Sequence, residues 1–224
     1  MSDIHRRISI NGSKFQEYIN GQQGTVHEGA LNVVILNAAK ISRSYYAGAY
    51  DASNPTRPTC WSADTDAPAP EVPALDRQAH RCMDCPQNIK GSGSGASRAC
   101  RFAQRLAVAI EGQLDTVYQL QLPATSLFGK ARDGKMPMQA YAQHLSSHDT
   151  PVISVITECA FDQSALVPKL FFKAVRPLAE DEVSLAVSQA GSQDAKDAIS
   201  MAISTPSIGS IFAEVDGFVY DANA

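Results

Sequence analysis

Residues 105–122 read RLAVAIEGQLDTVYQLQL and carry the strongest secondary-structure signal in the chain. Arg105–Ile110 is an apolar run of the length of a buried strand, and Glu111–Asp115 has the composition of a turn. Thr116–Leu122 alternates between two faces, as a half-buried strand does. The stretch therefore predicts two β-strands joined by a short connection.

The same reasoning extends to both sides of this stretch. Leu31–Leu36 (LNVVIL), Val152–Ala160 and Leu166–Val175 are predicted to be strands, and a proline within the last indicates a sheet edge or a late start. A helix is expected to begin at Pro137, because apolar residues follow it at helical spacing. Glu180–Ile203 has an acidic first turn and one apolar stripe, which predicts an amphipathic C-terminal helix.

This order of elements predicts an α+β fold that is mainly β. Five or so strands with a helix before the penultimate one resemble an OB-like barrel, whose open face and loops bind single strands or oligosaccharides. A generic α+β sandwich fits the same pattern and stays open. The predicted parts are an N-terminal extension over residues 1–29, an OB-like core over 30–203 with an insertion at 51–104, and an acidic tail over 204–224.

The insertion differs from the rest of the chain in composition. Residues 51–100 hold six of the 12 prolines and the GSGSG run at 91–95, and no periodic apolar pattern crosses them. Such a segment cannot build a hydrophobic core by itself. It also holds four of the five cysteines, which offer another way to hold it together.

These four cysteines have the spacing of a metal site. Cys60, Cys82, Cys85 and Cys100 follow the pattern C-x21-C-x2-C-x14-C. In a reducing cytosol clustered cysteines are metal ligands more often than disulfides, and four thiolates select a structural zinc ion. An iron–sulfur cluster and incidental thiols are the alternatives. Cys159 lies in an apolar strand pattern and is expected in the core.

Several classes of protein are disfavoured by the sequence. The chain has no run of about 18 apolar residues that could span a membrane. Its N-terminus, MSDIHRRISINGSKF, has no apolar signal segment, so we expect it to remain in the cytosol. It has neither a G-x-x-x-x-G-K-[ST] loop nor a G-x-S-x-G elbow, and it lacks the H-x-E motif of zinc deaminases. The chain is therefore not expected to be an enzyme.

The net charge of −4 hides an uneven distribution along the chain. Residues 40–135 carry 12 basic and 9 acidic side chains, whereas residues 136–224 carry 4 basic and 11 acidic ones. This division is expected if one surface meets a polyanion and the tail does not, although ordinary solvated faces vary as much.

In the basic part, cations occur beside aromatic residues. Proteins bind single-stranded nucleic acid by placing Lys and Arg along the phosphates and stacking bases on aromatic rings. The candidate contact residues are Lys40, Arg43, Tyr45, Tyr46, Tyr50, Trp61, Arg98, Arg101, Lys130, Arg132 and Lys135. The aromatic members fit a core position equally well, and the last three cations also fit an ordinary solvated face.

The cysteines belong to a longer pattern. It comprises PTCWS (58–62), CMDCPQN (82–88), Gly91-Ser, Cys100 and RLAV (105–108), followed by PKLFF (168–172) and VRPL (175–178). The pattern resembles zinc-ribbon-containing single-stranded-DNA-binding proteins of lytic tailed bacteriophages. The resemblance implies a structural zinc ion and a non-catalytic role in phage DNA replication, recombination or transcription.

The leading hypothesis is therefore a phage single-stranded-DNA-binding protein of the host cytoplasm, with the zinc loop as one wall of its groove. Such proteins often act as homo-oligomers. The resemblance also implies that the acidic, aromatic tail docks phage or host replication or transcription proteins, although it does not end on the acidic-Phe terminus typical of such tails.

The rival hypothesis is a zinc-containing protein-interaction module, an adaptor or an inhibitor of a host enzyme. Basic residues scattered over the surface would favour this rival.

Overall fold

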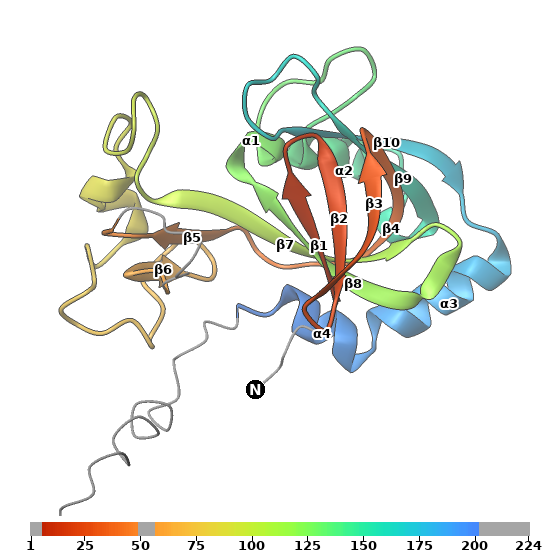
Figure 1. Cartoon of the computed structure of the whole chain (residues 1–224), viewed down its shortest axis with the longest axis horizontal. Helices are drawn as coiled ribbons and strands as arrows, with labels where there is room; N and C mark the ends of the chain where they lie inside the picture. The colour runs from red at the N-terminus through yellow and green to blue at the C-terminus, as the bar shows by residue number, and fades with distance from the viewer. Residues whose placement is uncertain (1–5, 49–56, 202–224) are drawn as a thin grey trace, which may run out of the picture.

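The computed structural model describes residues 6–48 and 57–201 and shows a mainly β protein with helices at its C-terminal end (Figure 1). In these residues ten strands belong to one sheet, and eight of them follow the path β10-β9-β4-β7-β8-β1-β2-β3. The sheet curls into a half-barrel (Figure 1). The strands are β1 (Arg6–Asn11), β2 (Lys14–Ile19), β3 (Gln22–Glu28), β4 (Ala30–Ala38), β5 (Ser42–Tyr45), β6 (Cys60–Ser62), β7 (Arg101–Ile110), β8 (Gln113–Pro123), β9 (Val155–Phe161) and β10 (Leu170–Pro177).

The helices are short and lie on both faces of the sheet. They are α1 (Ala124–Leu127), α2 (Met138–Ser147), α3 (Glu180–Ala190) and α4 (Gln193–Ile199), with 3₁₀ turns at Cys82–Asp84, Pro86–Asn88 and Val152–Ser154. The helix expected after Pro137 is confirmed as α2. No helix in the described part of the chain is long and apolar enough to cross a membrane.

The central hairpin is β7–β8, which confirms the two strands predicted from residues 105–122. The strands are antiparallel, and Leu106 lies opposite Leu120. Both side chains are fully buried inside the curl of the sheet. This inner core also contains Tyr141 of α2, whose hydroxyl is 2.8 Å from the hydroxyl of Thr157 on β9.

The outer face of the sheet is covered by α3 and α4 through small side chains. Ala186 and Ala195 of these helices pack in one cluster with Ala107 of β7, which allows helix and sheet to approach closely. The sequence predicts one helix over Glu180–Ile203, but the structure divides it. The helix α3 ends at Ala190, with Gly191 as its C-cap, and the Ser192 hydroxyl accepts a hydrogen bond from the Ala195 amide to begin α4.

The N-terminal segment differs from the prediction of a separate extension over residues 1–29. Residues 6–28 form β1, β2 and β3 of the same sheet, and β1 runs parallel to β8. Phe15 is fully buried, with its ring centroid 4.6 Å from that of Phe161. These strands contain few apolar residues, so the sequence pattern gives little sign that Ile8 and Phe15 enter the core.

Of the insertion predicted at 51–104, the described residues 57–100 form an arm beside the half-barrel (Figure 1), whereas residues 101–104 belong to β7. We call residues 57–100 the cysteine arm. Its short strand β6 pairs with β5, which in turn pairs with the first residues of β7. The strand β7 therefore belongs to both parts of the molecule, since its later residues pair with β4 and β8.

The place of the N-terminal strands can be tested by stability. We expect Phe15→Ala to lower the free energy of unfolding by about 3–5 kcal/mol, because it leaves a cavity in the inner core. The matched control Val26→Thr changes a half-exposed residue of β3 and should alter it by less than about 0.5 kcal/mol. Urea denaturation measures both variants. A separate extension would instead make the two variants equally harmless.

Candidate functional site

The cysteine arm has little hydrophobic core of its own. Its apolar cluster consists of Cys60, Trp61 and Val72, with Tyr45 of β5 packed against it. Backbone hydrogen bonds join distant parts of the arm, such as that from the Cys82 amide to the Asp66 carbonyl at 2.8 Å. In the described part of the arm, distant segments are thus joined by a small apolar cluster and by backbone hydrogen bonds.

The four predicted metal ligands come together at one place in this arm. Cys60, Cys82, Cys85 and Cys100 are each 8% exposed, carry free thiols and line a single cavity of about 20 Å³. A cavity of this volume has room for one water-sized sphere. Cys159 lies apart from them in the inner core, as predicted.

Burial opposes ionisation of two of the four thiols, those of Cys82 and Cys100. Burial raises the pKa of Cys100 to about 12 and also raises the pKa of Cys82, against a lowering effect of the nearby Arg43 charge. In the described part of the chain, no three Cys, His, Asp or Glu side chains already stand at metal-ligating geometry. Four cysteines that line one small cavity supply the type of donor that a structural zinc ion takes.

Arg43 reaches the same cavity from β5. Its side chain is buried, and one terminal nitrogen donates a 3.3 Å hydrogen bond to the Cys82 carbonyl. Its guanidinium carbon lies 4.2 Å from the ring centroid of Phe102. Among the described residues, its buried Nε has no hydrogen-bond partner and no carboxylate forms an ion pair with it.

A groove of about 890 Å³ lies between the cysteine arm and the strands β1 and β8. Its cations come from two parts of the chain: Arg7 is on β1, whereas Lys90, Arg98 and Arg101 are on the arm or at its junction with β7. Cys100 lines both the groove and the cysteine cavity. The fold thus places the cysteine cavity directly behind one wall of the groove.

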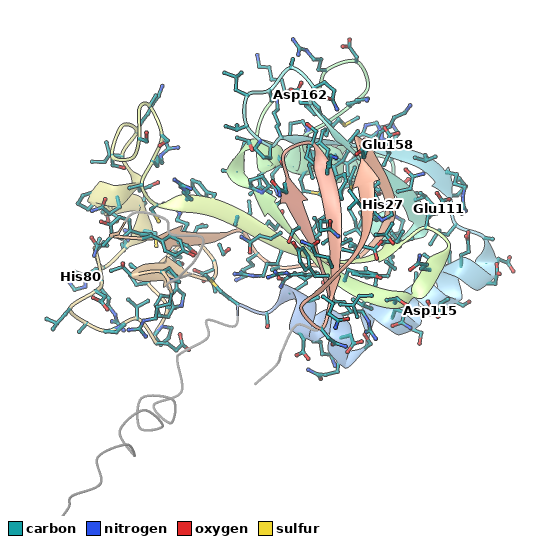
Figure 2. The ribbon with its side chains drawn as sticks, in the orientation of Figure 1. His27, His80, Glu111, Asp115, Glu158 and Asp162 are labelled. Carbon is teal, nitrogen blue, oxygen red and sulfur yellow. The ribbon has the colours of Figure 1, made fainter. Side chains whose placement is uncertain are left out.

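The charge of the groove is of one sign. None of its described lining residues is Asp or Glu, and its four cations form no ion pair with any other described residue. The Arg98 Nε donates to the Asn88 carbonyl at 2.6 Å, which fixes that side chain against the arm. Figure 2 shows the labelled carboxylates Glu111, Asp115, Glu158 and Asp162 on the half-barrel, away from the arm where His80 lies.

Apolar and aromatic groups complete the lining. Phe102 lies in the groove, and the half-exposed Phe128 meets it edge-to-face with ring centroids 5.5 Å apart. Val167 and Pro168 from the loop before β10 contribute to the lining near α1. Cations and aromatic rings are the groups that bind the phosphates and the bases of a nucleic-acid strand.

The predicted contact residues divide into three groups. Arg98 and Arg101 line the groove. Arg43 and Trp61 are buried, Tyr45 is half-buried, and all three line the cysteine cavity. The remaining described candidates are exposed but do not line the groove: Lys40, Tyr46, Lys130, Arg132 and Lys135. Tyr50 lies outside the described residues.

Sequence analysis missed two cations of the groove. Arg7 belongs to a segment that the sequence separates from the core, and Lys90 precedes the glycine run without an aromatic neighbour. Phe102, with Arg101 and Arg105 as near neighbours, belongs to the pattern of cations beside aromatic residues, although it is not among the candidate contact residues. The pairing of β1 with β8 places Arg7 at the groove.

Comparison with known proteins assigns no family to the chain. No protein-family model, curated protein or solved structure matches the chain. The functional interpretation therefore depends on the groove and the cysteine cavity.

The loop that carries Arg98 supplies a test of the arm. A Cβ at Gly93 would lie 2.7 Å from the Ser97 hydroxyl and 2.9 Å from the Arg98 carbonyl carbon. We expect Gly93→Ala to destabilise this loop by about 1–3 kcal/mol, which is about 5- to 150-fold in its opening equilibrium. Hydrogen exchange of the Gly91 amide, which donates to the Ser97 carbonyl, measures the change. Gly48→Ala, in open space, is the control, and equal exchange in the two variants would contradict the packing described.

Proposed function

We propose that this chain binds single-stranded DNA in the groove between the cysteine arm and the half-barrel, without catalysing a reaction. The observation that carries the proposal is the lining of the groove: four cations, no described carboxylate and an aromatic ring. Cations along a groove release the counterions of the phosphates, which drives binding of any sequence. The curled, mainly β sheet is compatible with the OB-like barrel that we propose as its fold type.

The aromatic part of the groove favours a single strand over a duplex. Phe102 and Phe128 present ring surface beside the cations. Stacking of a base on such a ring contributes about 1–3 kcal/mol, but the bases of a duplex are already stacked and would first have to be flipped out. Single-stranded DNA can therefore contact both the cations and the rings of the groove, whereas duplex DNA would first have to unstack its bases to reach the rings.

The proposal includes a structural zinc ion in the cysteine cavity. Cys60, Cys82, Cys85 and Cys100 would hold it, and the bound ion would cross-link three separate segments of the arm. Because the arm has few apolar contacts, this cross-link is what gives its groove-facing wall a fixed shape. The ion is assigned no chemical step.

The biological setting is proposed from the resemblance to phage proteins. A non-catalytic single-strand binder would act in phage DNA replication, recombination or transcription within the host cytoplasm. Docking of replication or transcription proteins is proposed for the acidic tail over 204–224, which lies outside the described residues. Self-association is proposed on the same basis.

A second candidate function is a protein-interaction module. The cysteine arm exposes three large apolar side chains, namely Leu75, Met83 and Ile89, and Leu75 is 99% exposed. Such exposed apolar side chains favour a protein partner, as do Lys40, Lys130, Arg132 and Lys135, which are exposed outside the groove. The gathering of Arg7, Lys90, Arg98 and Arg101 at one groove favours DNA instead.

Salt dependence tests the DNA proposal. The logarithm of the association constant for oligo-dT should fall against the logarithm of salt concentration with a slope of about −3, since each phosphate contact on a single strand contributes about −0.7. Lys90→Gln should weaken binding and make this slope shallower by about 0.7. Fluorescence anisotropy at several salt concentrations measures both quantities.

The matched control is Lys173→Gln on β10, an exposed lysine that does not line the groove. It should leave the affinity and the slope unchanged. If oligo-dT does not bind at low salt, or if Lys173→Gln and Lys90→Gln weaken binding equally, the groove is not the DNA site.

Metal content tests the zinc proposal. Elemental analysis should find about one zinc ion per chain, and Cys85→Ser should abolish it, because a structural site requires all four ligands. Cys159→Ala removes a thiol from the inner core and should retain the zinc. Equal zinc in the Cys85→Ser and wild-type proteins would contradict the proposed ligand set.

A further inference from the structure

Arg43 is the one described cation that is buried beside the cysteine cavity, and no described carboxylate pairs with it. We propose that Arg43 is a positioning residue that neutralises part of the negative charge of a metal–thiolate centre and holds Phe102 in the groove. Arg43 would then couple metal binding to DNA binding without contacting the DNA. This inference depends on the zinc site and the DNA groove proposed above.

The charge of Arg43 is buried without an anionic partner among the described residues. A guanidinium that leaves water without such a partner is strongly destabilised. The buried Arg43 side chain has one hydrogen bond to a carbonyl, and its Nε has no partner among the described residues. Its near neighbours are the four thiols that line the same cavity. A divalent ion held by four thiolates is a dianion, and this dianion is the missing counter-charge.

Arg43 also contacts a residue that lines the groove. Arg43 and Phe102 lie directly opposite each other on the antiparallel strands β5 and β7. The guanidinium carbon lies 4.2 Å from the centroid of the Phe102 ring, within cation–π distance. The same ring lines the groove and meets Phe128. One side chain therefore contacts a backbone carbonyl of the cysteine turn and a ring that faces the DNA.

The two contacts make metal binding and DNA binding depend on each other. Loss of the ion leaves the Arg43 charge without compensation, which favours movement of its guanidinium away from the ring. The Phe102 ring then loses the contact that orients it, and the DNA affinity falls. Because coupling of two equilibria is reciprocal, bound DNA should in turn slow the release of the metal.

The experiment compares Arg43→Gln with Arg101→Gln, which removes an exposed groove cation. Zinc release to a chromogenic chelator is measured without DNA, and oligo-dT binding is measured against salt. For Arg43→Gln we expect at least tenfold faster release and at least threefold weaker DNA binding at unchanged salt slope. For Arg101→Gln we expect unchanged release and a slope that is shallower by about 0.7.

Two further variants keep the test decisive if Arg43→Gln does not fold. Arg43→Lys keeps the charge but not the planar guanidinium, so it should retain zinc and still bind DNA more weakly. Phe102→Leu should retain zinc at the wild-type rate and lose DNA affinity. Retention of zinc by Arg43→Gln together with a shallower salt slope would show a direct phosphate contact and overturn the proposal.

The same measurements separate this inference from the proposed function. If the wild-type protein holds zinc but does not bind oligo-dT, the DNA function fails, and faster zinc release from Arg43→Gln still supports charge compensation. If the wild-type protein holds no metal, the inference about Arg43 is overturned. The DNA function is then still tested by comparing the oligo-dT binding of the wild type with that of Lys90→Gln.

Discussion

Four cysteines of the cysteine arm line one small cavity, and we propose that the shape of the arm depends on a metal ion bound there. The cysteine arm crosses 44 residues with only a minor apolar cluster, so packing alone does not fix its shape. Cys60, Cys82, Cys85 and Cys100 come from separate segments of this arm, and Cys100 also lines the groove. Cys100 therefore connects the cysteine cavity with the wall of the groove.

The strand β7 connects the cysteine arm to the half-barrel. Its first residues pair with β5 at the arm, and its later residues pair with β4 and β8 in the centre of the sheet. Arg101 and Phe102 lie where the two parts meet, and both line the groove. Arg7 lines the groove from β1, which pairs with β8.

Sequence patterns predicted the parts of the fold in which apolar residues dominate. The strands β4, β7, β8, β9 and β10 and the helix α2 were all expected near their observed places, because burial on a sheet or helix face leaves a clear period. The polar N-terminal strands gave no such period, so Phe15 was not recognised as a core residue. The division at Gly191 was missed because the apolar stripe continues across it on both α3 and α4.

The sequence indicated the chemical groups of the site better than their positions in space. The four cysteines line one cavity, and Arg98 and Arg101 line the groove, but their roles as metal ligands and DNA contacts stay predictions. Arg43 was expected on the surface, but it is buried. The alternation of side chains along a strand does not say which face another segment will cover, and here the arm covers the face that carries Arg43.

Photo-cross-linking of iodouridine-substituted oligo-dT, read by peptide mass spectrometry, tests the groove most directly. The account predicts cross-links in peptides that contain Phe102 and Phe128; cross-links confined to β10 or α3 would contradict it.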